Sequence, residues 1–256
     1  MGFFKGPSEF LNDGQVIPIP AGKGDTRTIQ LRVLFTPGHA EDHICLLMED
    51  HLGQTNAVFT GDAILGHGST TVRNLPDFMR SLYRIRAISE GEVAAPTADS
   101  SVVQPSRSFM LFPAHGQEVT DYRKRIDDNI ANRLDRISKT ADFLSKNSHN
   151  VWIKESELLR SVYPEVPQPL RMAALLNLRH SLFWIASDSE SLPSPVNFPR
   201  NSLIARISDG SERIIDVAEF YSLLDCFERS QNRMPGVVRE DVKHMLCTDW
   251  EWKFSA

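Results

Sequence analysis

The chain has 256 residues, enough for one large domain or two modest ones, and its 41% apolar and 24% charged residues are typical of a globular protein. The net charge of −5, from 28 basic and 33 acidic residues, excludes binding to nucleic acid or anionic lipid through bulk charge and leaves only a local basic face for it. No apolar run reaches the length of a membrane span, and Cys45, Cys226 and Cys247 form no CxxC pair, so we expect reduced thiols in a soluble protein of the cytoplasm, with the mitochondrion as the alternative.

Four short apolar runs predict strands in the first half of the chain. They cover residues 29–35, 44–48, 57–59 and 109–112. A helix with apolar residues three and four apart is expected between the third and fourth runs, from a cap at Asn74 to Ile85. Residues 1–28 are rich in glycine, proline and polar residues, with a turn expected at 12–14, and residues 90–108 are expected to form a surface insertion.

The second half is predicted to be mainly helical. Apolar residues from Ile126 to Leu144 mark one face of a long amphipathic helix with charged residues on its other faces. We expect two shorter helices, over 155–162 and 169–185. A linker rich in serine and proline should follow over 187–202, and then a hairpin of 203–207 with 213–217. This change of character predicts a division into three segments, 1–120, 121–186 and 187–256.

Three of the strand-like runs end in glycine-containing loops that carry metal-ligating residues. These loops contain His39, Asp62 and His115. Zinc hydrolases use imidazoles and carboxylates that converge on the ion and leave a position for water, whose pKa falls to about 7. A single histidine of this kind is more often an ordinary loop residue, but the same context at all three positions favours a metal site.

The sequence segments around these residues resemble the later three metal motifs of the metallo-β-lactamase superfamily. The matching segments are TPGHAEDHIC from Thr36, FTGDAILGHGSTT from Phe59, and Pro113-Ala114-His115-Gly116. They are similar to the β-lactamase-like protein 2 branch and to the fungal acyl-carrier thioesterases, over roughly residues 12–185. The resemblance implies an α/β fold: a partial αββα sandwich over 1–120, a helical winged-helix-like domain over 121–186, and an extension over 187–256.

The resemblance also implies the chemistry. Members hydrolyse esters, thioesters, amides or phosphodiesters with two zinc ions; the mammalian-type members of this branch cut single-stranded RNA, and the fungal ones release polyketides from carrier proteins. By position, His39 is expected to bind one zinc, His115 the other, and Asp62 to bridge them and act in catalysis. We therefore expect a small ester or thioester, or single-stranded RNA, as substrate, and no membrane partner; the sequence does not predict an oligomeric state.

One part of the family pattern is missing. The first motif, HxHxDH, supplies two ligands to each zinc and should precede His39, but residues 1–38 contain no histidine. Each ion would keep one imidazole and the shared carboxylate, fewer than the three or four protein ligands of a zinc site. The remaining fold would also expose an apolar sheet face. The sequence is explained by a chain that begins late, which we favour, or by a degenerate paralogue that binds or regulates without catalysis.

Two further histidines bear on the site. His43 lies four residues after His39, but Pro37-Gly38 predicts a loop there, so we expect His43 beside the metal rather than on it. His67 lies in a glycine-flanked loop that matches one near the family's active site, where it is expected to contact substrate; a plain loop histidine is the alternative.

The long helix that begins near residue 121 carries six basic residues that bear on RNA binding. Interleaved aspartates favour a solvated, salt-bridged face over phosphate binding. The six residues are Arg123, Lys124, Arg125, Arg133, Arg136 and Lys139.

Overall fold

The computed structural model describes residues 10–20, 28–50, 53–90, 105–147, 151–186, 203–206, 212–213 and 250–254. These residues belong to two compact units. The first unit comprises Met1–Thr71 and Arg80–Asn129, and the second comprises Val72–Met79 and Ile130–Ala256. The predicted division into 1–120, 121–186 and 187–256 stays a prediction.

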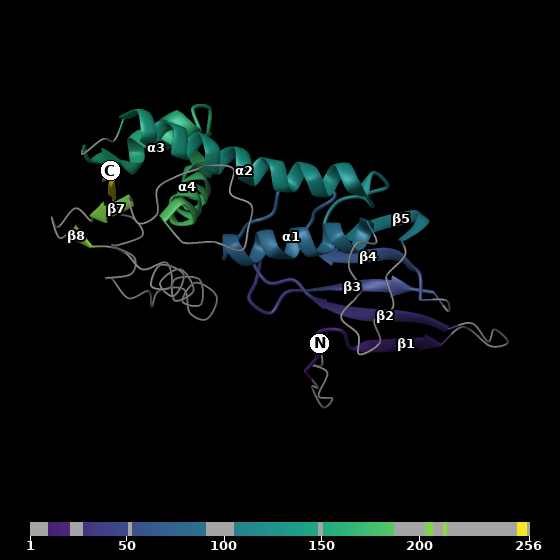
Figure 1. Cartoon of the computed structure of the whole chain (residues 1–256). Helices are drawn as coiled ribbons and strands as arrows, with labels where there is room; N and C mark the ends of the chain where they lie inside the picture. The colour runs from purple at the N-terminus through teal and green to yellow at the C-terminus, as the bar shows by residue number, and fades with distance from the viewer. Residues whose placement is uncertain are drawn as a thin grey trace, which may run out of the picture. The chain divides into compact units, whose positions relative to one another are not determined.

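The first unit contains a mixed sheet of five strands, in the order β1-β2-β3-β4-β5 (Figure 1). The strands are β1 (Val16–Pro20), β2 (Thr28–Phe35), β3 (Ile44–Glu49), β4 (Thr55–Gly61) and β5 (Pro105–Pro113). Neighbouring strands are antiparallel from β1 to β4, whereas β4 and β5 are parallel. A parallel pair needs a crossover connection, and the chain between β4 and β5 includes helix α1 (Leu75–Glu90). The predicted α/β class is therefore confirmed.

The centre of one face of this sheet is buried. The register pairs Leu34 with Cys45, and Leu47 with Val58, and all four side chains have 0% exposure. Helix α1 is tied to the end of β2, because Ser81 donates a hydrogen bond to the carbonyl of Pro37 and Arg84 donates one to the carbonyl of Phe35. This anchoring fixes the start of the loop that carries His39.

The opposite face carries apolar side chains that remain partly open. Ile29 and Phe35 on β2 are 45% and 41% exposed, and Phe59 on β4 is 39% exposed. Phe59 stacks on Phe112 of the neighbouring strand, with ring centroids 5.4 Å apart. The expectation of an apolar sheet face open to solvent is confirmed at these positions.

The second unit combines helices with a small four-stranded sheet. Its sheet order is β6-β9-β7-β8, and all pairs are antiparallel. Glu155 is fully buried and accepts hydrogen bonds from Arg179 and from the indole of Trp252. The elements are β6 (Ile153–Lys154), α3 (Glu155–Val162), the 3-10 turn η1 (Gln168–Leu170), α4 (Arg171–Ala186), β7 (Leu203–Arg206), β8 (Glu212–Arg213) and β9 (Glu251–Phe254).

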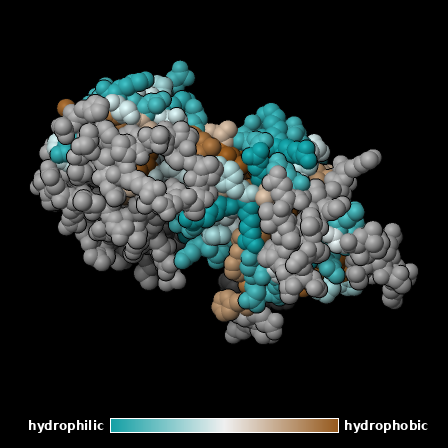
Figure 2. All heavy atoms as spheres, viewed as in Figure 1, coloured by the Kyte–Doolittle hydropathy of each residue, from teal (hydrophilic) through white to brown (hydrophobic). Residues whose placement is uncertain are grey.

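The long helix α2 (Tyr122–Asn147) contributes residues to both units. Its visible outer surface is largely hydrophilic (Figure 2). Lys124 pairs with Asp128, and Lys139 with Asp135, as expected for a salt-bridged surface. Among the described residues, no helix combines the length and apolar character needed to cross a bilayer.

Most expected elements match the structure, and three short strands were missed. The described parts of the hairpin pair as predicted, but β1, β6 and β9 were not expected. Residues 105–108 belong to β5 rather than to the expected insertion, whose residues 91–104 lie outside the described part. Cys226 and Cys247 also lie outside it, and the winged-helix character of the C-terminal part stays a prediction.

Candidate metal centre

Three loops at one edge of the sheet carry the candidate ligands. Strands β2 and β4 are both antiparallel to β3, and β4 is parallel to β5, so β2, β4 and β5 end at the same edge. His39, Asp62 and His115 follow these three ends. Nε2 of His39 lies 3.6 Å from Oδ2 of Asp62, and Nε2 of His115 lies 3.5 Å from Oδ1. The structure thus brings the three residues together, while their metal-binding role stays a prediction.

The distances at Asp62 suit two metal positions better than two hydrogen bonds. Both exceed the usual 2.7–3.2 Å of an N–H···O bond. Two donor atoms that share a tetrahedral zinc at about 2.0–2.1 Å lie about 3.3–3.4 Å apart. Oδ1 of Asp62 is buried, and no described residue donates a hydrogen bond to it. A buried carboxylate oxygen in that state is costly, and a cation would relieve the cost.

The donor set fits zinc only in part. Each of the two positions has one imidazole nitrogen and one oxygen of Asp62. Within the described ranges, no three histidine, cysteine, aspartate or glutamate side chains gather closely enough to hold an ion. The described residues therefore offer half of each coordination shell. A zinc ion at either position would need further ligands beyond these two.

His39 is oriented by contacts on the far side of its ring. Its Nδ1 lies 3.0 Å from the carbonyl oxygen of Thr71 and 3.0 Å from the hydroxyl of Thr70. Because a carbonyl can only accept, Nδ1 carries the proton, and the lone pair is left on Nε2 toward Asp62. Histidine ligands of metal ions are oriented in this way in general.

His43 binds the backbone of the site rather than pointing at a metal position. The amide of Asp62 donates a hydrogen bond to Nε2 of His43 over 3.1 Å, and Nδ1 lies 2.8 Å from the hydroxyl of Thr36. Because Nε2 accepts, the proton of the neutral ring lies on Nδ1 and is donated to Thr36. Burial lowers the pKa of His43, with His39 adding to the effect, which favours this neutral form.

The buried thiol of Cys45 extends this network. The hydroxyl of Thr36 donates to Sγ of Cys45 over 3.3 Å, and the thiol donates to the carbonyl of Thr60 over 3.6 Å. Burial raises the pKa of Cys45 to about 12, so the sulfur stays protonated at neutral pH. Cys45 is therefore a structural thiol and not a ligand.

The loops after β4 and β5 are joined to each other directly. The amide of Gly66 donates to the carbonyl of His115, and the amide of Ala114 donates to the carbonyl of Gly61. At Gly116, with φ of +93°, a Cβ would lie 2.7 Å from Nδ1 of His67. The exposed ring of His67 therefore lies against the His115 loop; its predicted contact with substrate stays a prediction.

Arg125 has a structural role that its charge pattern did not indicate. Its guanidinium donates to the carbonyl of Leu65 over 2.9 and 2.7 Å and to the carbonyl of Gly68 over 2.8 Å. It thus fixes the loop between Asp62 and His67. The interpretation of Arg125 as part of a solvated or phosphate-binding face is wrong. No sequence spacing indicates this contact, or those of Thr70 and Thr71 with His39.

No family model matches the sequence, but the chain is similar to several curated proteins. The chain is 31% identical to an atrochrysone carboxyl ACP thioesterase of Aspergillus chevalieri over 175 residues, which are 67% of this chain and 47% of the relative. It is 27% identical to a β-lactamase-like protein 2 homologue of Caenorhabditis elegans over 158 residues, 62% of this chain and 45% of the relative.

A solved structure supports the fold. A β-lactamase domain protein from Burkholderia ambifaria matches 81% of this chain and 52% of its own with a TM-score of 0.52 and 18% identity. The chain spans about half the length of the curated relatives that it matches.

Proposed function

We propose that this chain, which is similar to lactamase-like proteins, to β-lactamase-like protein 2 homologues and to an atrochrysone carboxyl ACP thioesterase, serves zinc-dependent hydrolysis of an ester or thioester. One observation carries the proposal. The carboxylate of Asp62 lies between the Nε2 atoms of His39 and His115, at 3.6 and 3.5 Å, with a buried oxygen that accepts no hydrogen bond from the described residues.

The residues of the site divide the work as follows. His39 presents the lone pair of Nε2, because Thr71 holds the proton on Nδ1. Asp62 offers one oxygen toward each histidine, and the His43 contact fixes its backbone. Zinc, when bound, polarises the substrate and supplies hydroxide near neutral pH. His67 is exposed beside His115 and contacts the substrate in this proposal.

A small-molecule substrate is favoured over RNA within this proposal. One relative is named as a thioesterase. Two of the arginines expected on an RNA-binding face are not presented on an open surface, because Arg125 binds the 65–68 loop and Arg133 is 4% exposed. Cleavage of single-stranded RNA remains the alternative hydrolytic activity, and an assay that offers both substrates separates the two.

A second candidate function is binding without catalysis. It is favoured by the absence, within the described ranges, of three clustered ligands that could hold an ion. Such a protein would keep the sheet edge and its loops as a recognition surface. It would fold stably without zinc and would not hydrolyse ester, thioester or RNA substrates.

The deciding experiment measures zinc content and hydrolysis on the same samples. Wild type, His39→Ala and Asp62→Asn are dialysed against zinc and then assayed with an acyl thioester, an aryl ester and single-stranded RNA. The matched control is Asp128→Asn, which removes a surface carboxylate that is 53% exposed and pairs with Lys124. We expect zinc and thioester hydrolysis in wild type and the control and their loss in both site variants. Zinc content unchanged in the site variants contradicts the metal centre, and a stably folded, zinc-free wild type with no hydrolysis supports the binding protein.

A further inference from the structure

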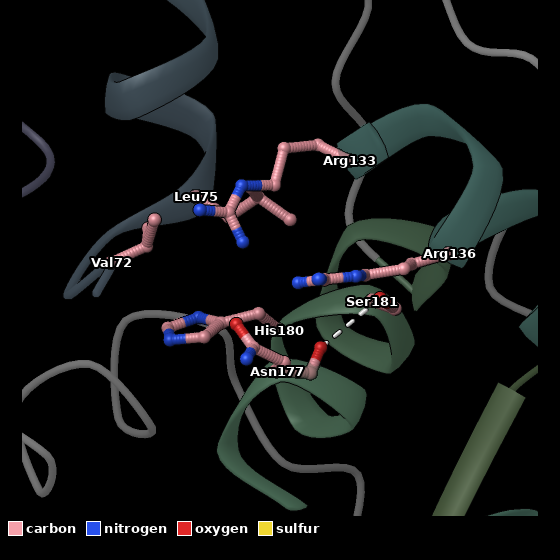
Figure 3. Close-up of a pocket in the computed structure, with 7 residues that line it drawn as sticks. All are labelled: Val72, Leu75, Arg133, Arg136, Asn177, His180 and Ser181. Atoms are coloured by element: carbon pink, nitrogen blue, oxygen red, sulfur yellow. Dashed lines mark hydrogen bonds between the residues drawn. The ribbon is translucent and has the colours of Figure 1, made fainter. Parts of the chain in front are cut away.

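A small pocket in the second unit gathers cationic and polar side chains that the proposed hydrolysis does not use. Its lining comes from the segment at the start of α1, from α2 and from α4 (Figure 3). The centre of a water molecule could move within about 10 Å³ of this pocket, so the pocket has room for about one water molecule or an atom of similar size. The lining residues are Val72, Leu75, Arg133, Arg136, Asn177, His180 and Ser181.

Two guanidinium groups approach this space from α2. In Figure 3 the side chains of Arg133 and Arg136 both extend from the helix toward the region above Asn177 and His180. Arg133 is 4% exposed, and its guanidinium lies 5.5 Å from the centre of the Phe78 ring. Burial lowers the pKa of Arg133 to about 10, with Arg136 adding to the effect, so the Arg133 guanidinium is still cationic at neutral pH.

Arg136 supplies an unsatisfied donor. Its guanidinium lies 5.7 Å from the centre of the Tyr163 ring, and its Nη1 is buried with no hydrogen-bond acceptor among the described residues. A buried charged donor without an acceptor is costly, and an anion repays this cost better than water because it also offsets the charge.

The other polar groups of the pocket are compatible with an anion. Burial lowers the pKa of His180 to about 4, so this ring is neutral at pH 7. Asn177 presents a side-chain amide, whose NH₂ group can donate. The hydroxyl of Ser181 donates to the carbonyl of Asn177 instead. No aspartate or glutamate is among the described residues that line the pocket.

From this arrangement we propose that the pocket binds one small anion between Arg133 and Arg136. The available space fits a halide, or one oxygen of a carboxylate or phosphate group that enters from outside. Anion binding there joins α2, α4 and the start of α1 and stabilises the second unit. Sequence patterning placed these two arginines on a solvated, salt-bridged face; the structure instead directs both into the pocket.

The direct test is crystallography of the full chain grown in sodium bromide. We expect an anomalous bromide peak within hydrogen-bond distance of Arg136 in wild type and no such peak in Arg136→Gln. Density for a non-anomalous water at this position, with bromide present at other surface sites, overturns the proposal.

A solution test covers the case in which the variant is unstable. The melting temperature is followed by tryptophan fluorescence while gluconate is replaced by chloride, and separately by phosphate, at constant ionic strength. For wild type we expect a rise of about 3–5 °C for each tenfold anion increase above the dissociation constant. Arg136→Gln should lose this rise, and Arg136→Lys should keep part of it.

The matched control is Lys139→Gln, which removes a positive charge from the same helix at an exposed residue paired with Asp135. It should keep the full rise. A larger response to phosphate than to chloride identifies an oxyanion as the ligand, and the reverse identifies a halide. Equal responses in wild type and Arg136→Gln contradict the site.

Discussion

The backbone amide of Asp62 donates a hydrogen bond to Nε2 of His43, 3.1 Å away, and this contact ties the bridging position of the candidate metal centre to the start of β3. The same ring reaches Thr36 at the end of β2 through Nδ1. His43 therefore links the β2, β3 and β4 ends with one neutral imidazole. Because both ring nitrogens take part in these hydrogen bonds, the neutral His43 ring has no lone pair left for a metal ion.

Replacing His43 should weaken metal binding without removing a ligand. Loss of a supporting contact typically costs about 10–100-fold in metal affinity, and we expect a loss of this size for His43→Ala. His43→Gln should recover part of it, because the amide oxygen of glutamine can accept from the Asp62 amide. Competitive zinc titration with a chromophoric chelator measures both. The control, His67→Ala, removes a nearby exposed imidazole and should bind zinc as wild type does. Equal affinity in wild type and His43→Ala would contradict the positioning role.

Gly61 should tolerate no side chain, because two separate costs meet there. Its φ of +51° is unfavourable for other residues, and a Cβ would lie 2.8 Å from Nε2 of His43. The first cost alone is about 1 kcal/mol. Gly53→Ala is a matched control, since Gly53 has φ of +75° and, chain neighbours aside, no atom of the described residues lies within 4 Å of the position that its Cβ would take. Urea unfolding followed by circular dichroism should show a clearly larger loss of stability for Gly61→Ala than for Gly53→Ala. Equal losses would mean that the His43 side chain moves away from the added methyl group at no cost in stability.

Local patterns were enough to predict the strands and helices that position the site. Alternation in β2 and apolar spacing in α1 are strong signals, because each element buries one face. β1 was missed because Pro18 and Pro20 argue against a strand. Among the described strands, however, β1 pairs only with β2, and an edge position tolerates proline. β6 and β9 were missed because they are two and four residues long and pair across nearly a hundred positions of the chain.

The site was predictable in its residue types but not in its supporting contacts. His39, Asp62 and His115 follow strand ends, which the sequence shows directly. The contact of Arg125 with Leu65 spans 60 residues, and Thr71 contacts His39 from 32 residues away. Such contacts depend on tertiary packing, and no local spacing encodes them.

The partly exposed sheet face predicts how surface substitutions affect association. Phe59 is 39% exposed, whereas its neighbour Val58 points to the buried face with 0% exposure. Phe59→Thr keeps strand propensity but should cost about 1–2 kcal/mol, because the stacking on Phe112 and part of the apolar burial are lost. It should reduce self-association, because exposed apolar patches drive it. Val58→Thr buries a hydroxyl and should destabilise by about 1–3 kcal/mol. Light scattering and urea unfolding measure the two effects; unchanged association in Phe59→Thr would show that this face does not drive it.

His180 should make the second unit less stable in acid. Burial lowers its pKa to about 4 from the ordinary value of 6.5, with Arg133 adding to the effect and a hydrogen bond to the Val72 backbone opposing it. Between these two values the unfolded chain binds more protons than the folded one, so stability rises with pH. The contribution is complete above pH 6.5, is lost as the pH falls to about 4, and amounts to about 3 kcal/mol.

Tryptophan fluorescence isolates this effect, because Trp152, Trp184, Trp250 and Trp252 all belong to the second unit. Urea unfolding between pH 4 and pH 7.5 should show a steeper pH dependence for wild type than for His180→Gln, which cannot be protonated. The exposed His67→Gln control should follow wild type, because no buried imidazole is removed. If wild type and His180→Gln lose stability in parallel as the pH falls, the buried ring of His180 is not the group that takes up the proton on unfolding.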